Sequence, residues 1–227
     1  MLDRCKLENI LEELRKERPI FHFEADFQYA LALKIREKFS NSIIRLEKRE
    51  KINGKNIKVD IFVYFCKEES CTYIELKYKT VSFEIEEIEL NIGNESCKMK
   101  EKYELKNQQA WDIGGYDFCK DIERLENLVK NCSKCTGFAI FLTNDPSYWK
   151  PPQRKSNADA FRIHEGKVLQ GRLEWGENTS ENTMQGRKDP IVLTGKYCLE
   201  WKDYSKLGDV KENGNFRYLL VEVKRNI

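Results

Sequence analysis

Apolar residues with helical spacing mark three stretches of the chain. Leu7, Ile10, Leu11 and Leu14 predict a short helix over 6–17, which Pro19 ends. A second helix is expected over 24–39, with its inward stripe at Glu24, Gln28, Leu31 and Ile35. The third and longest is expected over 109–130. Glu24 therefore heads a helix face that should meet the core.

Alternating apolar and polar residues predict strands between these helices. Three successive strands are expected at 42–50, 56–65 and 71–80, and Asn53-Gly54 predicts a tight hairpin turn between the first two. Residues 81–92 are expected to form a fourth strand or to prolong the third, and the polar stretch 93–107 to be a loop. The apolar run 137–145 predicts a buried strand. This order predicts an α/β fold with a central mixed β-sheet flanked by helices.

The chain changes character after Pro146, where a polar connector with two prolines begins. We divide it into a core at 1–146 and a strand-rich C-terminal extension at 147–227, which forms a second lobe or completes the same domain. Short strands are expected in the extension at 161–166, 191–195, 196–204 and 216–223.

Charge and cysteine content limit the partners and the compartment. The 227 residues are 34% charged but carry a net charge of only +2, so nucleic acid would have to bind a local cluster, for which 34–58 is the candidate. No apolar run reaches the roughly 20 residues of a membrane helix, and the N-terminus lacks an apolar signal core. We expect a cytoplasmic protein whose eight cysteines are reduced thiols, with no membrane partner.

Charged residues lie inside two of the predicted strands. Asp60 shares its strand face with Lys58, Phe62 and Tyr64, and Glu75 and Lys77 project side by side from the next strand. If these strands form a hairpin, Asp60 lies beside Glu75. Two carboxylates in a partly dry place need a proton, a cation or a metal, and such oxygens suit Mg²⁺. With Lys77 beside them they fit metal-assisted phosphodiester hydrolysis. The alternative is a solvated sheet face with cross-strand ion pairs.

Asp60, the Glu75-Leu76-Lys77 triplet and the upstream Glu24 together resemble the PD-(D/E)XK nuclease superfamily, over about residues 20–145. The resemblance implies a restriction-endonuclease-like core. It also implies that Asp60, Glu75 and the Leu76 carbonyl bind Mg²⁺ or Mn²⁺, that Lys77 serves the attacking water, and that Glu24 is the additional helix acid. Val59 stands where the family motif has proline.

Several further side chains are weaker candidates. On or before the third helix, substrate contacts are expected from Gln108, Gln109, Tyr116, Lys120 and Arg124, with the last three away from the apolar stripe.

The cysteines and the histidines are not expected to form a site. Cys132 and Cys135 form a C-x-x-C pair without a second tight pair, so a structural zinc ion or an iron–sulfur cluster is not expected. His22 and His164 are expected to be structural or exposed.

The leading hypothesis is a Mg²⁺-dependent nuclease that cleaves DNA rather than RNA, in restriction, defence or repair. The alternative is a non-catalytic module on a nuclease-like fold that binds nucleic acid or protein. A homodimer is a further possibility, because restriction-type enzymes commonly dimerise to cut both strands of DNA.

Overall fold

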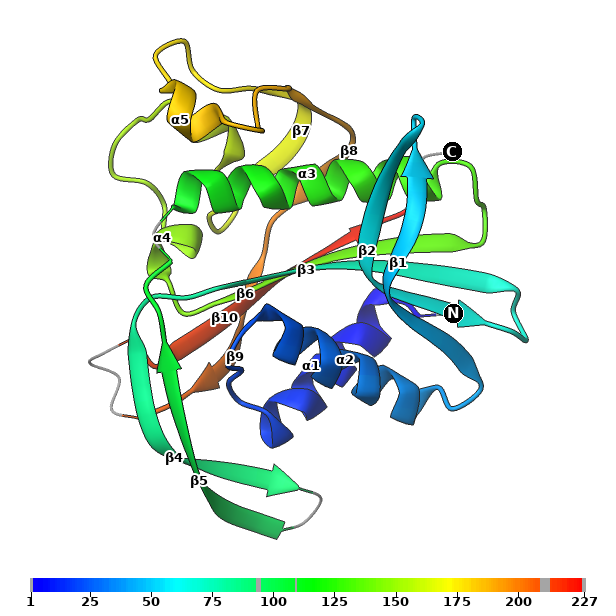
Figure 1. The fold of residues 1–227 in the computed structure, drawn as a ribbon, viewed down its shortest axis with the longest axis vertical. Coiled ribbons are helices and arrows are strands. Elements are labelled where there is room, and N and C mark those ends of the chain that lie inside the picture. Colours follow the sequence, from blue (N-terminus) through cyan, green and yellow to red (C-terminus); the bar gives the residue numbers. More distant parts are fainter. Residues whose placement is uncertain (1, 93–94, 109, 209–212, 226–227) are drawn as a thin grey trace.

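The computed structural model describes all residues except 1, 93–94, 109, 209–212 and 226–227. Its centre is a six-stranded sheet of order β1-β2-β3-β6-β10-β9, in which β3 and β6 run parallel and all other neighbours antiparallel (Figure 1). The six strands are β1 (Ser42–Ile52), β2 (Lys55–Phe65), β3 (Ser70–Lys79), β6 (Cys135–Thr143), β9 (Trp201–Lys206) and β10 (Asn215–Val223).

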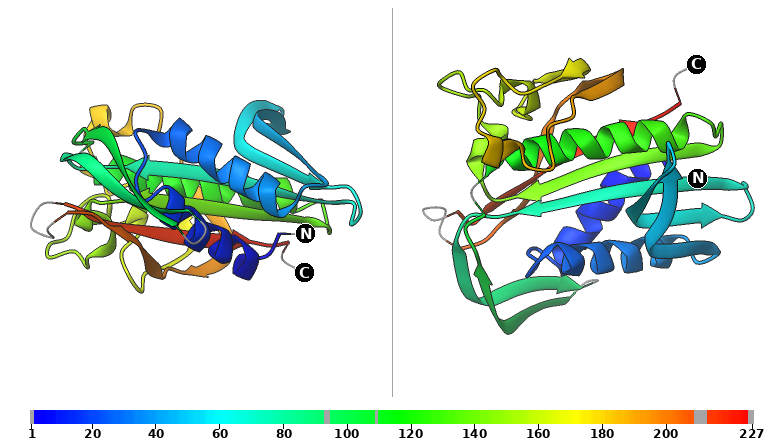
Figure 2. Two further views of the ribbon diagram at one scale, coloured as in Figure 1. Left: turned by 90° about the horizontal axis from the view of Figure 1, so that it is seen from below. Right: turned by 45° about the horizontal axis from the view of Figure 1, so that its top comes forward.

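Helices cover both faces of this sheet, so the fold is α/β with a mixed central sheet and additional strands. One face carries α1 (Arg4–Glu17) and α2 (Glu24–Lys38), and the other carries α3 (Trp111–Val129), as Figure 2 shows. The two-stranded sheet of β7 (Val168–Leu173) and β8 (Ile191–Cys198) lies over α3. The short helices α4 (Pro146–Trp149) and α5 (Glu181–Met184) and a 3₁₀ turn (Asp159–Phe161) complete this side.

The predicted hairpin of the first two strands is confirmed. Asn53 and Gly54 adopt φ angles of 49° and 80°, which a type I′ turn requires, and Ile52 pairs with Lys55. The strand faces are also as expected: Ile61 and Val63 lie in the core beneath α1 and α2, whereas Phe62 packs on the α3 side.

Three expectations about strands are wrong. The expected strand 196–204 is divided between β8, which ends at Cys198, and β9, which begins at Trp201. The stretch expected as a loop at 93–107 contains β5 (Glu95–Leu105), which pairs with β4 (Phe83–Ile92) in a separate hairpin. Its alternating Tyr103 and Leu105 are buried, but most other described side chains of β5 are exposed, which hid the strand.

Residues 161–166 do not form the expected strand. Phe161 and Ile163 are buried, as strand alternation predicts. The backbone nevertheless turns at Phe161, where a 3₁₀ turn ends, and the Ile163 carbonyl accepts a hydrogen bond from the Trp201 indole at 2.7 Å rather than from a neighbouring strand.

The chain after Pro146 contributes to the central sheet. β10 pairs with the core strand β6, and β9 pairs with β10 at the sheet edge. The hairpin of β7 and β8 is attached to α3 through the buried Glu126 carboxylate. This group accepts hydrogen bonds from the backbone N–H groups of Thr194 and Gly195 and from the Tyr197 hydroxyl.

Candidate functional site: an acid and cation cluster at the free edge of β3

The site forms where β2 bends away from β3 at Asp60. Pairing between the two strands ends at Ile61 and Ile74. At Asp60 the backbone carbonyl accepts a hydrogen bond from Gln28 Nε2 of α2 at 2.7 Å. Opposite Asp60, Glu47 of β1 has a φ angle of 52°, a left-handed backbone conformation that is uncommon for residues other than glycine. Beyond Ile74, no strand among the described residues pairs with this edge of β3.

Two carboxylates take the place of that strand. Asp60 Oδ2 accepts a hydrogen bond from the Leu76 N–H at 2.6 Å, and Glu24 Oε2 accepts one from the Tyr78 N–H at 2.8 Å. Glu24 can do this because it begins α2 and its helix packs on β3. Asp60 and Glu24 therefore meet on one edge of β3 although 36 positions separate them in the sequence.

On the α3 side, two acids and two cations form ion pairs. Lys77 Nζ lies 2.5 Å from Asp121 Oδ2 and 3.0 Å from the Leu76 carbonyl oxygen. The guanidinium of Arg124 lies 2.9 Å from Glu75 Oε1 and 3.0 Å from Asp121 Oδ1. The side chains of Glu75 and Asp121 are only 1% and 3% exposed, so the ionised form of either group depends on these partners.

Burial perturbs the acidity of this cluster. It raises the pKa of Asp60 to about 6, although the Leu76 N–H and Lys77 act in the opposite direction. Burial, and then the neighbouring Asp121, also raise the pKa of Glu75, against the effect of Arg124. Burial alone would lower the pKa of Lys77, but Asp121, Glu24 and Asp60 raise it above its ordinary value. Lys77 is therefore a fixed cation among carboxyl groups that change protonation at higher pH than usual.

The expected Mg²⁺ or Mn²⁺ site is wrong for this arrangement. The carboxylates of Asp60, Glu24 and Glu75 are held separately by N–H groups and a guanidinium. Across the described residues, just one group of three or more potential ligand side chains comes close enough to share an ion, and it consists of Cys71, Cys132 and Cys135. The cysteines expected to remain separate thiols are thus the convergent set, whereas the acids are not.

Of the weaker substrate candidates that the structure describes, only Arg124 joins the cluster. Tyr116 is not away from the apolar stripe as expected: it is 3% exposed and donates a hydrogen bond to the Asp189 carbonyl. Lys120 pairs with Glu123 at 2.5 Å. Gln108 is exposed and lies before α3, and Gln109 lies outside the described residues.

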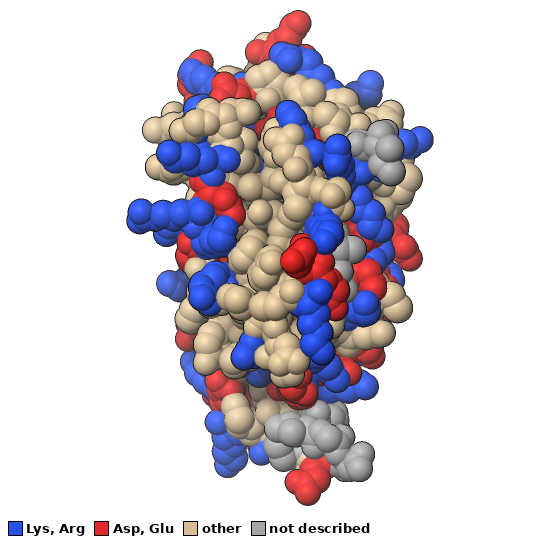
Figure 3. All heavy atoms as spheres, turned by 90° about the vertical axis from the view of Figure 1, so that its right-hand side faces the viewer, with Lys and Arg blue, Asp and Glu red and all other residues tan. Residues whose placement is uncertain are grey.

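Part of the basic stretch 34–58 is paired with acids, although Arg45, Arg49 and Lys51 are exposed. Lys34 is buried and lies 2.6 Å from Glu17 and 2.9 Å from Glu37. Lys58 lies 3.3 Å from Glu47. Figure 3 shows Lys and Arg interspersed with Asp and Glu on the face at the right of Figure 1, with no single continuous basic patch.

Sequence reasoning missed Asp121 as a member of the site. The residue lies three positions after Phe118 and four before Leu125, on the inward stripe of α3. A carboxylate on that stripe was the available signal. Gln28 was placed on the inward face of α2, but its hydrogen bond to the Asp60 carbonyl could not be inferred from spacing.

Neither histidine belongs to the cluster. His22 lies 2.9 Å from Glu101 and stacks on Tyr103, and His164 is half-buried with its ring 2.9 Å from the Glu165 carbonyl oxygen.

None of the described helices combines the length and the apolar character needed to cross a membrane. No protein-family model, curated protein or solved structure matches the chain.

Proposed function

We propose that this chain is a nuclease that hydrolyses phosphodiester bonds, preferentially in DNA, on a restriction-endonuclease-like core. The observation that carries the proposal is the placement of Asp60 and Glu24 on the edge of β3 where β2 diverges, next to Glu75 and Lys77 on the α3 side of the same strand. The order of elements from α2 through β1, β2, β3 and α3 to β6 supports the same core. A role in restriction, defence or repair follows from that proposal.

The cluster contains a base and an acid suited to hydrolysis near neutral pH. With its pKa raised to about 6, Asp60 is ionised at neutral pH and can accept a proton from the attacking water. The water oxygen bonds to phosphorus as the bond to the leaving oxygen breaks. Glu75, whose raised pKa favours the protonated form, donates a proton to that leaving oxygen.

Two cations can stabilise the charge that develops on the phosphoryl oxygens. Lys77 stays protonated, and the Arg124 side chain is 25% exposed at the mouth of the cluster. Arg124 also covers Glu75. A phosphate that attracts the guanidinium to itself would therefore uncover the acid in the same movement.

Cleavage assays on purified protein test this proposal. Linear, supercoiled and single-stranded DNA and RNA are incubated in chelator and with added divalent salts, so that the assay presupposes no cofactor. We expect D60N and E75Q each to lower the cleavage rate by at least about 10²-fold. K120M, which alters a half-buried cation on the same helix that pairs with Glu123 instead, should cleave at the wild-type rate. Equal rates for D60N and wild type, with both folded by circular dichroism, would rule out these roles.

The second candidate is a non-catalytic module that binds nucleic acid or protein. It is favoured by the internal pairing of Glu75 with Arg124 and of Asp121 with Lys77, which already neutralises part of the cluster. Binding of nucleic acid that weakens steeply with salt, without cleavage under any of the tested conditions, would favour this function.

A further inference from the structure

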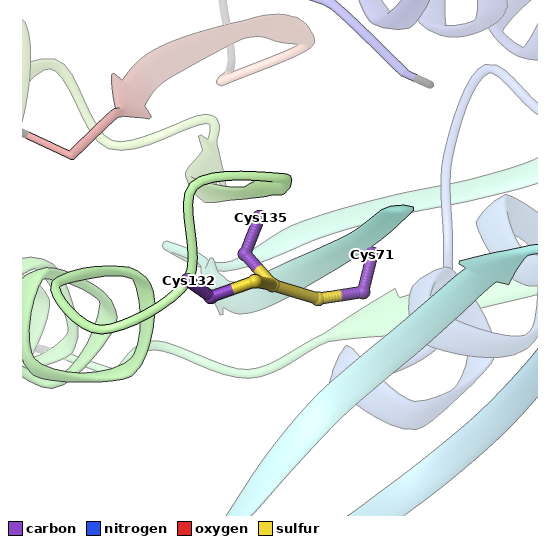
Figure 4. A group of neighbouring side chains, drawn as sticks. All are labelled: Cys71, Cys132 and Cys135. Carbon is purple, nitrogen blue, oxygen red and sulfur yellow. A yellow bond between two sulfur atoms is a disulfide. The ribbon is translucent and has the colours of Figure 1, made fainter. Parts of the chain in front are cut away.

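Three cysteine sulfurs converge at the opposite end of β3 from the acid cluster. Cys71 lies near the start of β3, Cys135 begins β6, and Cys132 lies in the turn between α3 and β6. Their sulfur atoms all lie within 4.8 Å of one another. Figure 4 shows the three side chains pointing toward one another. Cys71 and Cys135 are buried and Cys132 is half-buried, so solvent reaches the group from the side of Cys132.

The backbone brings these residues together. Cys71 and Cys135 are direct neighbours across the parallel pairing of β3 and β6, with Cα atoms 4.8 Å apart. Cys132 and Cys135 have Cα atoms 5.3 Å apart, and the Cys135 N–H donates to the Cys132 carbonyl at 3.2 Å. The Cys71 N–H donates to the Lys134 carbonyl at 3.0 Å. A strand, a second strand and a closed turn thus fix the three positions independently of side-chain choice.

Disulfide chemistry cannot engage all three sulfurs at once. The structure pairs Cys135 with both Cys71 and Cys132. A cysteine sulfur forms one disulfide at a time, so either bond leaves the third cysteine unpaired beside it. A metal ion with three thiolate ligands uses all three together, and soft thiolates select thiophilic cations such as Zn²⁺.

We propose that Cys71, Cys132 and Cys135 bind one thiophilic divalent cation, with zinc as the reference ion, and leave its fourth position to an exchangeable ligand. Thiolates around tetrahedral zinc lie about 3.8 Å apart, from Zn–S bonds of about 2.3 Å. In the structure the Cys135 sulfur lies at disulfide distance from the other two, so the cysteines must first be reduced and their sulfurs must separate to that spacing. Three protein ligands with an open position distinguish this site from closed four-ligand structural sites. It does not depend on the proposed nuclease activity.

The remaining cysteines with described side chains lie outside the group. Cys66 is exposed in the turn between β2 and β3 and lines a groove with Lys38 and Phe39 at the end of α2. Cys198 is exposed at the end of β8. Both therefore serve as control positions.

The test uses full-length protein that has been reduced and stripped of metal with a chelator. Titration with Co²⁺ should produce a thiolate-to-cobalt charge-transfer absorption that saturates at one ion per chain and disappears when Zn²⁺ is added. Because Cys132 is only half-buried, C132S should fold, and we expect its Co²⁺ affinity to fall by more than about 100-fold, beyond the loss typical of residues that merely support a ligand. C66S and C198S should bind as wild type does.

Thermal unfolding gives a second measurement. Zn²⁺ should raise the melting temperature of wild type but not of C132S, since a ligand that binds only the native state stabilises it. Absence of the absorption in reduced, folded wild type would overturn the proposal, as would undiminished affinity in C132S. Loss of binding in C66S would overturn the three-ligand assignment.

Discussion

Replacing Lys77 with methionine should destabilise the protein strongly, because it removes a partner of a buried carboxylate. Lys77 Nζ lies 2.5 Å from Asp121 Oδ2, and the two side chains are 16% and 3% exposed. At an effective dielectric constant of about 20, that contact has a gross Coulomb energy of about 7 kcal/mol, which desolvation of both groups offsets in large part. Methionine keeps most of the volume of the lysine stem, so the change isolates the charge.

The net cost should be about 3 kcal/mol, at the lower end of the range for breaking a buried ion pair. The lower end applies because Arg124 still lies 3.0 Å from the other Asp121 oxygen. In a chain of this size, about 3 kcal/mol corresponds to a melting temperature lower by roughly 6–12 °C. Urea unfolding gives the free energy directly, and scanning calorimetry gives the temperature.

The cost should also depend on pH. Burial already raises the pKa of Asp121, and loss of Lys77 removes the neighbouring charge that lowers this pKa most. A carboxyl group with a raised native pKa favours the native state at low pH, and that contribution is lost as the pH rises through its native pKa. K77M should therefore be closest to wild type in acid and fall behind as the pH approaches neutrality.

Two further variants complete the test. K120M removes a half-buried cation 2.5 Å from Glu123, a more solvated pair than Lys77 and Asp121, and should cost no more than about 1 kcal/mol. The double variant K77M/D121N should recover most of the stability lost in K77M, because no unpaired carboxylate remains. If K77M unfolds at the same urea concentration as K120M, the buried ion pair of Lys77 and Asp121 does not stabilise the protein as expected.

Three other predictions concern separate parts of the fold. D60N should flatten the pH dependence of stability between about pH 4 and 6, because wild type loses stability there as Asp60, with its pKa raised to about 6, ionises; parallel profiles from urea unfolding would contradict this. E126Q should lower the free energy of unfolding by about 1–3 kcal/mol and speed amide hydrogen exchange in β8, since its NH₂ group would face backbone N–H donors. Unchanged exchange rates in β8 would show that Glu126 does not hold the β7–β8 hairpin on α3. G115A should lower the melting temperature despite the higher helix propensity of alanine, because its Cβ would collide with the Phe161 carbonyl oxygen; a stabilised variant would show that this contact relaxes.

Much of the central sheet could be predicted from the sequence because its strands differ clearly on their two faces. In β2, Val59, Ile61 and Val63 alternate with polar or aromatic residues, and all three are fully buried. Asn53-Gly54 fixed the hairpin turn through its need for positive φ angles. The positions of Asp60, Glu75 and Lys77 followed from this alternation.

The remaining features depend on contacts between distant segments. Asp121 meets Lys77 only because α3 packs across β3, and no local pattern specifies that register. Cys71 meets Cys135 through parallel pairing across 64 positions of sequence. Tyr116 was assigned to the surface of α3, but Trp175 stacks on it and Phe161 packs against it from the later chain. In each case the partner comes from a segment whose position is set by the assembled fold.

The two carboxylates on the free edge of β3 have a consequence for self-association. An uncovered strand edge offers N–H and carbonyl groups to a strand of another molecule and so promotes aggregation. Here the Leu76 and Tyr78 N–H groups are already occupied by Asp60 and Glu24, whose negative charges would also repel an approaching backbone carbonyl. The same side chains that we assign to chemistry therefore oppose the pairing of a foreign strand with this part of β3.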